Sequence, residues 1–359
     1  MKYIDEFRKR DCFDMSEIKE RYDNLDGLRT ISCLCIIAMH IRANANYDLP
    51  SVFDTIVASW TQFVPLFLMI SGFGMFCGYY EKFKNKTIDL NSFYAKRYRK
   101  LLPFFITLVL IDIVIDRSLY HVIEGITEIT LIFGLLPNNQ LSVIGVSWTL
   151  GVIFLFYMLF PFVDYLCWNK RRAWATFVGS IVLSLFCTYY FFTDKFVLED
   201  FSARHNFLYC APFFIGGGII YLYRDAIRRF LQRFQWLWLC VCIALTIAWY
   251  FAPCEQMVKN LILFLPWLMY AIGVKRSKIL SNKVMKYLSG ISLELYLAQM
   301  FIFRIIEKIN SLYLAGHGWV SFLLVWVAVV VGLIVFIEIW KRAWMFIQRK
   351  LKLEKRNGT

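Results

Sequence analysis

Charged residues are scarce in this sequence, and several features of common protein classes are missing. Asp, Glu, Lys and Arg make up 18% of the 359 residues, whereas about a quarter is usual for a soluble domain. Residues 1–29 are polar and charged, so the early apolar core of a cleavable signal peptide is lacking. We therefore expect the first apolar run to act as an uncleaved signal-anchor. No internal repeat is visible, and neither end has the composition of a soluble domain.

Cysteine spacing typical of a zinc site is also absent. Ten cysteines are present, but Cys33–Cys35 and Cys240–Cys242 are C-x-C pairs without a second pair at zinc spacing. Both pairs lie within apolar runs, where free cysteine commonly serves as a small buried side chain. We expect them to fill the core, and we predict no metal site.

Apolar residues are abundant instead. They account for 59% of the chain, the mean hydropathy is +0.54, and they form runs long enough to cross a bilayer, which takes about 20 residues per helix. The net charge of +14 could suggest nucleic acid. However, the basic residues cluster between the apolar runs, as the positive-inside rule describes for membrane proteins. The sequence predicts an all-α, polytopic membrane helix bundle with no nucleic-acid partner.

The order of apolar and basic segments predicts ten transmembrane helices. Residues 118–146 are only weakly apolar, and most of the 40 Lys and Arg residues fall on one side if this stretch makes no net crossing. We interpret it as an outer loop or a re-entrant element, with both termini cytoplasmic. The expected domains are a basic amphipathic arm (1–23), a membrane domain (24–341) and a basic tail (342–359). The predicted spans are 30–43, 55–80, 101–115, 147–166, 174–192, 207–223, 236–252, 260–274, 285–307 and 319–340.

The stretch Asn24–Ile41 combines a polar start with two ionisable residues, Arg29 and His40. Eleven positions correspond to about three helical turns, so both side chains share one face about 16 Å apart along the axis. An ionisable group inside a span is a functional candidate by default, although His40 could instead pack between helices against a carbonyl. Neutral imidazole is a competent general base near pH 7. This arrangement could hold a phosphorylated ligand at Arg29 and carry out chemistry at His40.

A basic cluster precedes the span that begins at 101. Lys96, Arg97, Arg99 and Lys100 could be an ordinary stop-transfer signal, which is the interpretation favoured for the two lysines. Arginine can bind phosphate through two parallel hydrogen bonds. Arg97 and Arg99 are therefore candidates for binding an acidic cofactor at the cytoplasmic side.

Several further residues are weaker candidates. Ser71, before Gly72, would need a neighbouring base to act as a nucleophile, and small residues there also favour helix packing. Glu294 is a carboxylate within a predicted span, as are Asp112 and Glu338, and each could pair with a cation or face a polar cavity. Residues expected on the outer side could contact an outer acceptor: His121, Arg204, His205 and His317.

Taken together, these segments resemble the acyltransferase-3 membrane acyltransferases, which modify surface polysaccharides. The similarity begins with LDGLR followed by His40 and extends over most of the predicted membrane domain. The matching segments are 25–29 with His40, VPLFLMISGF at 64–73, the basic cluster 96–100 before Leu101-Leu102-Pro103, Ser147-Trp148-Thr149-Leu150 with Phe156-Tyr157 and Pro161, PFFIGG at 212–217 and ISLELYL at 291–297.

The resemblance implies transfer of an acyl group, expected to be acetyl, from cytoplasmic acyl-CoA to a polysaccharide or lipid-linked sugar hydroxyl at the outer face of a bacterial inner membrane. It implies that His40 is the catalytic histidine, either activating the acceptor or carrying the acyl group transiently. It also implies that Arg29, Arg97 and Arg99 bind the acyl-CoA donor, with no permanently bound cofactor, and Trp148 is a further candidate. The chain departs from the family pattern at Ile153-Phe154, where many relatives have two glutamates, and at Gln299, where many have histidine.

Two other function classes also fit a polytopic chain. A transporter or exporter of small acids or lipid-linked sugars would be expected to show inverted repeats and paired Gly- or Pro-broken spans, and neither is clear here. A membrane sensor or scaffold would tolerate substitution of Arg29 and His40 without loss of acylation.

Overall fold

The chain folds as a bundle of α-helices. The computed structural model describes residues 22–131, 133–135, 143–197, 201–309 and 311–357, with side chains described as far as residue 350. These residues contain no β-strand, only isolated bridges, so the predicted all-α class is confirmed for them. The predicted arm at 1–23 lies almost wholly outside the described residues. The helices are α2 (Asp23–Asn44), α3 (Ser51–Ser59), η1 (Trp60–Gln62), α4 (Phe63–Lys84), α5 (Leu90–Ile115), α6 (Leu119–Ile129), η2 (Phe133–Leu135), α7 (Trp148–Leu166), α8 (Lys170–Phe186), η3 (Cys187–Phe191), η4 (Ala203–His205), α9 (Phe207–Leu222), α10 (Arg224–Phe251), α11 (Gln256–Gly273), α12 (Lys283–Gly290), α13 (Ser292–Lys308) and α14 (Trp319–Asn357).

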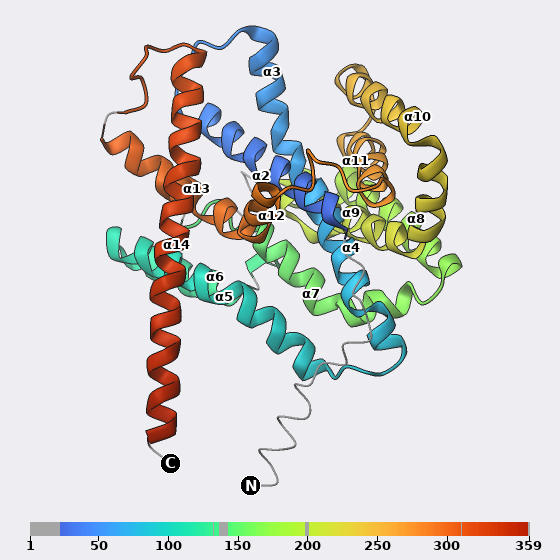
Figure 1. Cartoon of the computed structure of the whole chain (residues 1–359), viewed down its shortest axis with the longest axis horizontal. Helices are drawn as coiled ribbons and strands as arrows, with labels where there is room; N and C mark the ends of the chain where they lie inside the picture. The colour runs from blue at the N-terminus through green and yellow to red at the C-terminus, as the bar shows by residue number, and fades with distance from the viewer. Residues whose placement is uncertain (1–21, 132, 136–142, 198–200, 310, 358–359) are drawn as a thin grey trace.

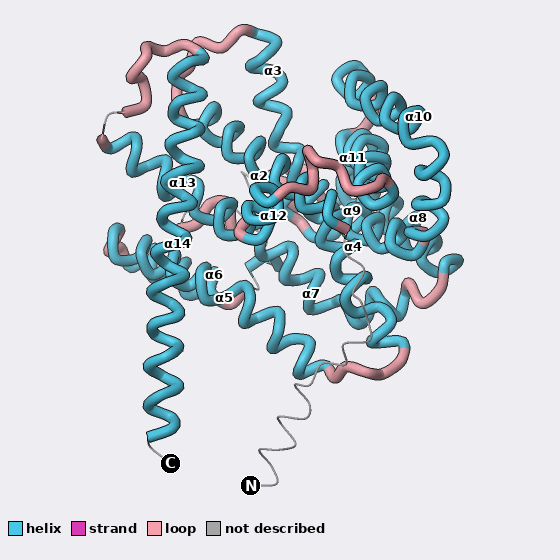
Figure 2. The backbone as a smooth tube through the Cα atoms, in the orientation of Figure 1, coloured by secondary structure: helices cyan, strands magenta, loops and turns pink. Residues whose placement is uncertain are grey.

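The helices pack around a central group formed by α2, α4, α7 and α9 (Figure 1). In this view α14 lies at one edge of the bundle and α10 at the other. Short loops join most of the helices (Figure 2). The polar side chains of Asp89, Asn169, Asn206, Glu255 and Asn282 each accept a hydrogen bond from a backbone N–H in the first turn of the following helix. Such caps satisfy N–H groups that have no partner within the helix.

Six helical segments among the described residues are long and apolar enough to cross a membrane. The bent pair α12–α13 would make seven if it counts as one span, and α9 is apolar but shorter. Each of the ten predicted spans coincides with a helix or a pair of helices. A multi-pass membrane bundle therefore fits the structure, while the number of ten spans and the side on which the termini lie remain predictions.

The weakly apolar stretch 118–146 forms no long helix in its described part. Its α6 has 11 residues, a length of about 16 Å, which is roughly half the hydrocarbon core of a bilayer. α6 packs against the end of α5. How many times this stretch crosses the membrane stays a prediction.

The predicted continuous span at 285–307 is wrong in one respect, because the helix breaks near Ile291. α12 and α13 meet there at an angle of 72°. Ser289 and Gly290 precede the break, and both residue types are poor helix formers. The Ser292 hydroxyl donates to the Ser289 carbonyl at 2.9 Å, which satisfies a carbonyl released by the break. After the bend, the start of α13 contacts α2, where the Cys33 thiol donates to the Ser292 carbonyl at 3.5 Å.

Two glycines allow α4 and α9 to cross in close contact. A side chain at Gly72 would collide with the backbone of Phe214, and one at Gly217 would collide with the backbone of Met69. Small residues at such crossings let helix backbones approach closely. Gly72 therefore serves packing, whereas its neighbour Ser71 faces a cavity on the other side of α4.

The last helix continues beyond residue 340, the predicted end of the last span. α14 has 39 residues, a length of about 58 Å, which exceeds the bilayer core by nearly a factor of two. Its C-terminal part extends away from the other helices (Figure 1). Lys341, Arg342, Arg349 and Lys350 lie in this part, where lysine and arginine can reach lipid headgroups.

Candidate active site

A cavity of about 290 Å³ lies where α2, α4, α5, α7, α12 and α13 meet. Three cationic side chains line it, Arg29 from α2 and Arg97 and Lys100 from α5. Glu294, in the first turn of α13, is the carboxylate in its wall. The excess of cations favours an anionic ligand, because charges attract more strongly away from bulk water.

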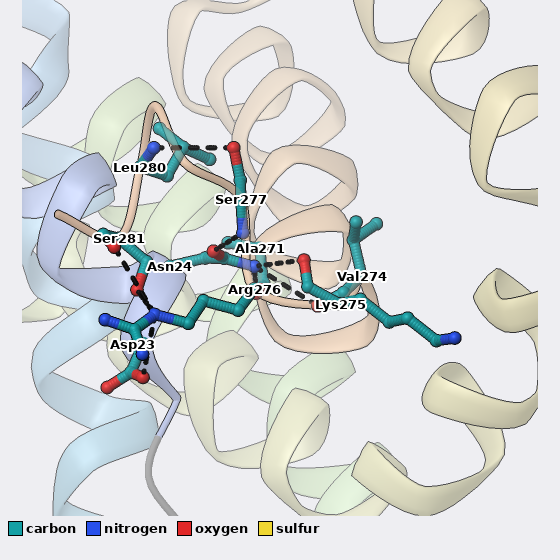
Figure 3. Close-up of polar contacts among 9 residues, drawn as sticks. All are labelled: Asp23, Asn24, Ala271, Val274, Lys275, Arg276, Ser277, Leu280 and Ser281. Carbon is teal, nitrogen blue, oxygen red and sulfur yellow. Dashed lines mark hydrogen bonds and ion pairs between the residues drawn. The ribbon is translucent and has the colours of Figure 1, made fainter.

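The start of α2 is attached to the segment that follows α11 (Figure 3). The amide nitrogen of Asn24 donates to the carbonyls of Ala271 and Val274 at 3.2 Å and of Lys275 at 3.4 Å. Its amide oxygen accepts from the N–H of Ser277 at 2.8 Å. Asn24 is 4% exposed, so these contacts are shielded from water and costly to lose.

Further contacts fix the first two turns of α2. The Asp26 carboxylate accepts from the Ser289 hydroxyl at 2.7 Å, beside the break between α12 and α13. The Thr30 hydroxyl donates to a backbone carbonyl of α12 at 3.0 Å. Gly27 lies so close to the backbone of Leu280 that a larger side chain would collide with it. We call the contacts of Asn24, Asp26, Gly27 and Thr30 the α2 anchor.

Arg29 projects from the α2 anchor into the cavity. Within the part of the chain that the structure describes, no hydrogen bond or ion pair engages its guanidinium. A guanidinium offers five N–H donors in a planar fork that matches phosphate or carboxylate. The backbone around Arg29 is therefore held in place by the α2 anchor, and the guanidinium is available to a ligand.

Arg97 lies between two aromatic rings. Its guanidinium carbon is 4.6 Å from the ring centre of Tyr79 and 4.9 Å from that of Tyr157. Stacking on both faces orients the guanidinium plane, and Nε is buried without a hydrogen-bond partner among the described residues. The Tyr157 hydroxyl lies 3.1 Å from the hydroxyl of Ser71, which also lines the cavity. No spacing in the sequence links these residues, which come from three different helices.

The other basic side chains of the cluster do not all face the cavity. Lys100 lines the cavity, although the sequence favoured a stop-transfer role for it. Lys96 and Arg99 are exposed and are not among the cavity-lining residues. Helical geometry accounts for this difference, because Arg97 and Lys100 are three residues apart and share a face. A role of Arg99 in donor binding remains a prediction.

His40 lies on α2 beyond the cavity rather than in its wall. α2 is continuous from Arg29 to His40, which confirms that one helix carries both. His40 is partly buried, and its Nδ1 lies 3.1 Å from the amide oxygen of Gln299. Between the two, Cys33 and Ile36 are 1% and 0% exposed, so the shared face is packed over this distance.

One hydrogen bond in the cavity wall involves a residue that neighbours the partner of His40. The hydroxyls of Thr149 and Tyr296, which both line the cavity, are 2.8 Å apart and buried. Tyr296 lies one helical turn before Gln299, whose amide nitrogen donates to the Tyr296 carbonyl at 2.8 Å. The Thr149–Tyr296 pair thus connects the cavity wall to Gln299, the hydrogen-bond partner of His40.

An aromatic cluster lies near His40 at the start of α7. The rings of Trp148 and His205 stack with centroids 4.0 Å apart. Neither ring nitrogen of His205 has a partner among the described residues, and burial together with the charge of Arg204 lowers its pKa to about 3. Arg204 donates to the Thr61 hydroxyl at 2.7 Å, and its charge also acts on His40. His205 is therefore neutral, and Arg204 is the cation beside His40.

The remaining candidates lie apart from the cavity. Asp112 accepts from His121 at 3.0 Å. Glu338 accepts from Tyr287 at 2.8 Å, and His317 is exposed. Over the described residues, no group of three or more His, Cys, Asp or Glu side chains could hold a metal ion.

Comparison with known protein families gives a match over most of the chain. A family model described as an acyltransferase domain matches residues 22–340, which includes the cavity, His40 and the aromatic cluster. Searches of curated proteins and of solved structures found no match. The residues that carry the resemblance therefore lie within the matched region.

Proposed function

The chain belongs to the acyltransferase family that this model describes, and on this premise we propose that it transfers an acyl group from acyl-CoA to a sugar hydroxyl. The acyl group proposed is acetyl, and the acceptor is a surface or secreted polysaccharide or its lipid-linked precursor. The apolar helices support a multi-pass membrane protein. We place it in the inner membrane of a bacterium, with the donor on the cytoplasmic side.

The observation that carries this proposal is the cationic cavity close to a histidine. Arg29, Arg97 and Lys100 supply donors for the phosphates of acyl-CoA, and arginine binds phosphate through paired, charge-assisted hydrogen bonds. A pocket for a whole drug-sized ligand usually has about 300 to 1,000 Å³. A cavity of about 290 Å³ would therefore hold part of acyl-CoA, with the remainder extending past the exposed Lys100.

His40 is the proposed general base. Its neutral imidazole removes the proton of the acceptor hydroxyl as that oxygen attacks the carbonyl carbon of the thioester. The tetrahedral intermediate then loses the sulfur of CoA as its C–S bond breaks. The imidazolium returns its proton to this sulfur, so the products are the sugar ester and free CoA. His40 is not among the residues that line the cavity, so side chains between the cavity and His40 would have to move during the reaction.

Replacement of His40 tests the proposal directly. Surface glycan from cells producing His40→Ala at normal protein levels should carry about 100-fold less acyl ester than glycan from wild-type cells, because general-base catalysis commonly contributes at least that factor. Mass analysis of the glycan provides the measurement, and cells lacking the protein provide the baseline. Undiminished acylation in His40→Ala cells would overturn the role of His40.

A second variant tests the donor site. Arg29→Lys keeps the charge but replaces a planar fork with a point charge, so purified protein should need about tenfold more acetyl-CoA for half-maximal release of CoA. A transporter of small acids would consume no acetyl-CoA in this assay. Unchanged dependence on acetyl-CoA concentration would contradict donor binding by Arg29.

A further inference from the structure

Gln299 forms two hydrogen bonds that together define its orientation. Its amide nitrogen donates to the backbone carbonyl of Tyr296 at 2.8 Å, and its amide oxygen lies 3.1 Å from Nδ1 of His40. The residue is 1% exposed, so water does not compete for either bond. The side chain joins α13 to α2 at the proposed catalytic histidine.

These bonds determine which nitrogen of His40 carries the proton. A backbone carbonyl can only accept, so the Gln299 group that faces Tyr296 must be the NH₂ group. The amide oxygen consequently faces His40, and it too can only accept. Nδ1 of a neutral imidazole must then be protonated, which leaves the lone pair on Nε2. The carbonyl of Ile36, one turn earlier in α2, also faces the imidazole as an acceptor.

We propose that Gln299 is a positioning residue that keeps His40 as the Nδ1–H tautomer, with Nε2 as the atom that exchanges protons with the substrate. This role rests on the function proposed above and adds the residue that prepares His40 to act as a general base. An amide orients the imidazole without adding a negative charge, unlike the carboxylate that often fills this position beside catalytic histidines. No hydrogen bond to Nε2 is found among the described residues, which leaves this atom available to an acceptor hydroxyl.

The charges around His40 agree with a neutral imidazole at rest. On α2, Arg42 pairs with Asp54, and on α13, Arg304 pairs with Glu307. Arg204, near the start of α9, is a cation whose charge reaches the imidazole. Gln299 adds no opposing charge, so the ring remains a base.

Gln299→Met tests the positioning role, because methionine has a similar length but accepts no strong hydrogen bond. With acetyl-CoA as donor and surface glycan from cells lacking the protein as acceptor, we expect kcat to fall about 10- to 100-fold. KM for acetyl-CoA should stay within about twofold, since the cavity is untouched. Gln256→Met on α11 removes one hydrogen bond, to Asn260, in which His40 takes no part, and should leave both constants unchanged.

Gln299→Glu distinguishes a positioning role from a purely structural one, because only the positioning role predicts a change in the pH dependence of kcat/KM. A carboxylate beside Nδ1 favours the imidazolium, so the acid limb of the kcat/KM profile should shift by about one pH unit toward higher pH. An unshifted profile in Gln299→Glu, together with unchanged kcat in Gln299→Met, would overturn the inference. If wild-type protein transferred no acetyl group at all, the proposed function itself would fail instead.

The tautomer can also be measured without activity. The chain has 4 histidines, so ¹⁵N NMR of histidine-labelled protein in lipid, compared with His40→Asn, isolates the His40 signals. We expect a protonated Nδ1 and an unprotonated Nε2 in the wild type, and a mixture of tautomers in Gln299→Met. Protonation at Nε2 in the wild type would overturn the assignment.

Discussion

The first and last turns of α2 differ in how their polar side chains are held. At the start, Asn24, Asp26 and Thr30 all bond to the segment between α11 and α13. Near the end, the His40 side chain has one side-chain partner, Gln299. The first region places a fixed cation, Arg29, in a cavity. The second leaves one nitrogen of an imidazole without a partner among the described residues.

This difference corresponds to two chemical requirements. A phosphate site works best when its donors are already oriented, because ordering flexible side chains costs free energy on binding. A general base needs a defined tautomer and a free lone pair, which a single well-placed acceptor can provide. The comparison predicts that changes near the α2 anchor affect donor binding and stability, whereas changes near His40 affect the chemical step.

Arg97→Ala should give the largest effect on donor binding. Its guanidinium is oriented by two tyrosine rings and has a buried donor without a partner. A hydrogen bond to a charged group contributes about 1.5 to 3 kcal/mol, so KM for acetyl-CoA should rise about 10- to 100-fold. Steady-state kinetics with purified protein provide the measurement.

Lys96→Ala is the matched control, because Lys96 is exposed on the same helix and lies outside the cavity. Its KM should change by less than about twofold. Arg99→Ala then decides whether that arginine contributes, as the sequence predicts, or not, as its exposed position suggests. Equal effects of Arg97→Ala and Lys96→Ala would contradict a specific donor site.

Asn24→Ala should cause the next largest effect, mainly on stability. The change leaves the Ser277 N–H and the carbonyls at the end of α11 without their partner, and each buried group left unsatisfied costs about 1 to 3 kcal/mol. We expect a loss of about 2 to 3 kcal/mol in the free energy of unfolding, measured by denaturant titration in detergent. KM for acetyl-CoA should rise as well, because Arg29 would no longer be fixed.

Asn91→Ala, at an exposed position in the first turn of α5, should change stability by less than about 0.5 kcal/mol. If Asn24→Ala is as stable as this control, the α2 anchor does not hold the helix as described. If stability falls but KM stays constant, the anchor stabilises the fold without positioning Arg29.

The sequence alone predicts the helices and indicates that one of them, α2, carries two candidate site residues. Apolar runs locate the helices, and helical periodicity puts Arg29 and His40 on one face of a continuous α2. Ser71 and Glu294, both singled out as polar residues in apolar surroundings, line the same cavity as Arg29. Local pattern is sufficient here, because each inference concerns a residue and its own helix.

Contacts between helices could not be predicted in the same way. Asn24 and Ala271 are 247 positions apart, and His40 and Gln299 are 259 apart. Periodicity shows which way a side chain faces but not which helix lies opposite. The sequence does not predict the break at Ile291 for a related reason. Ser289 and Gly290 permit a bend but do not require one, and the hydrogen bond from Ser289 to Asp26 of α2 helps to stabilise the bent arrangement.

The smallest effect expected is a pH-dependent one on the His40 side of the molecule. Burial and the charge of Arg204 lower the pKa of His205 from 6.5 to about 3. Below about pH 6.5 the unfolded chain binds a proton at this residue, whereas the folded chain does not until about pH 3. The free energy of unfolding should therefore decrease as the pH falls through this range.

His205→Phe tests this prediction because phenylalanine can stack on Trp148 but does not titrate. Thermal unfolding between pH 7 and pH 5 should show a smaller loss of Tm in this variant than in the wild type. His317→Asn, at an exposed position, should keep the wild-type dependence of Tm on pH. Asn24→Ala should keep it too, since the Asn24 side chain that this change removes is a neutral amide. A weaker dependence of Tm on pH in Asn24→Ala would mean that the α2 anchor and the region around His205 are energetically coupled. The distinction drawn between the two ends of α2 would then be wrong.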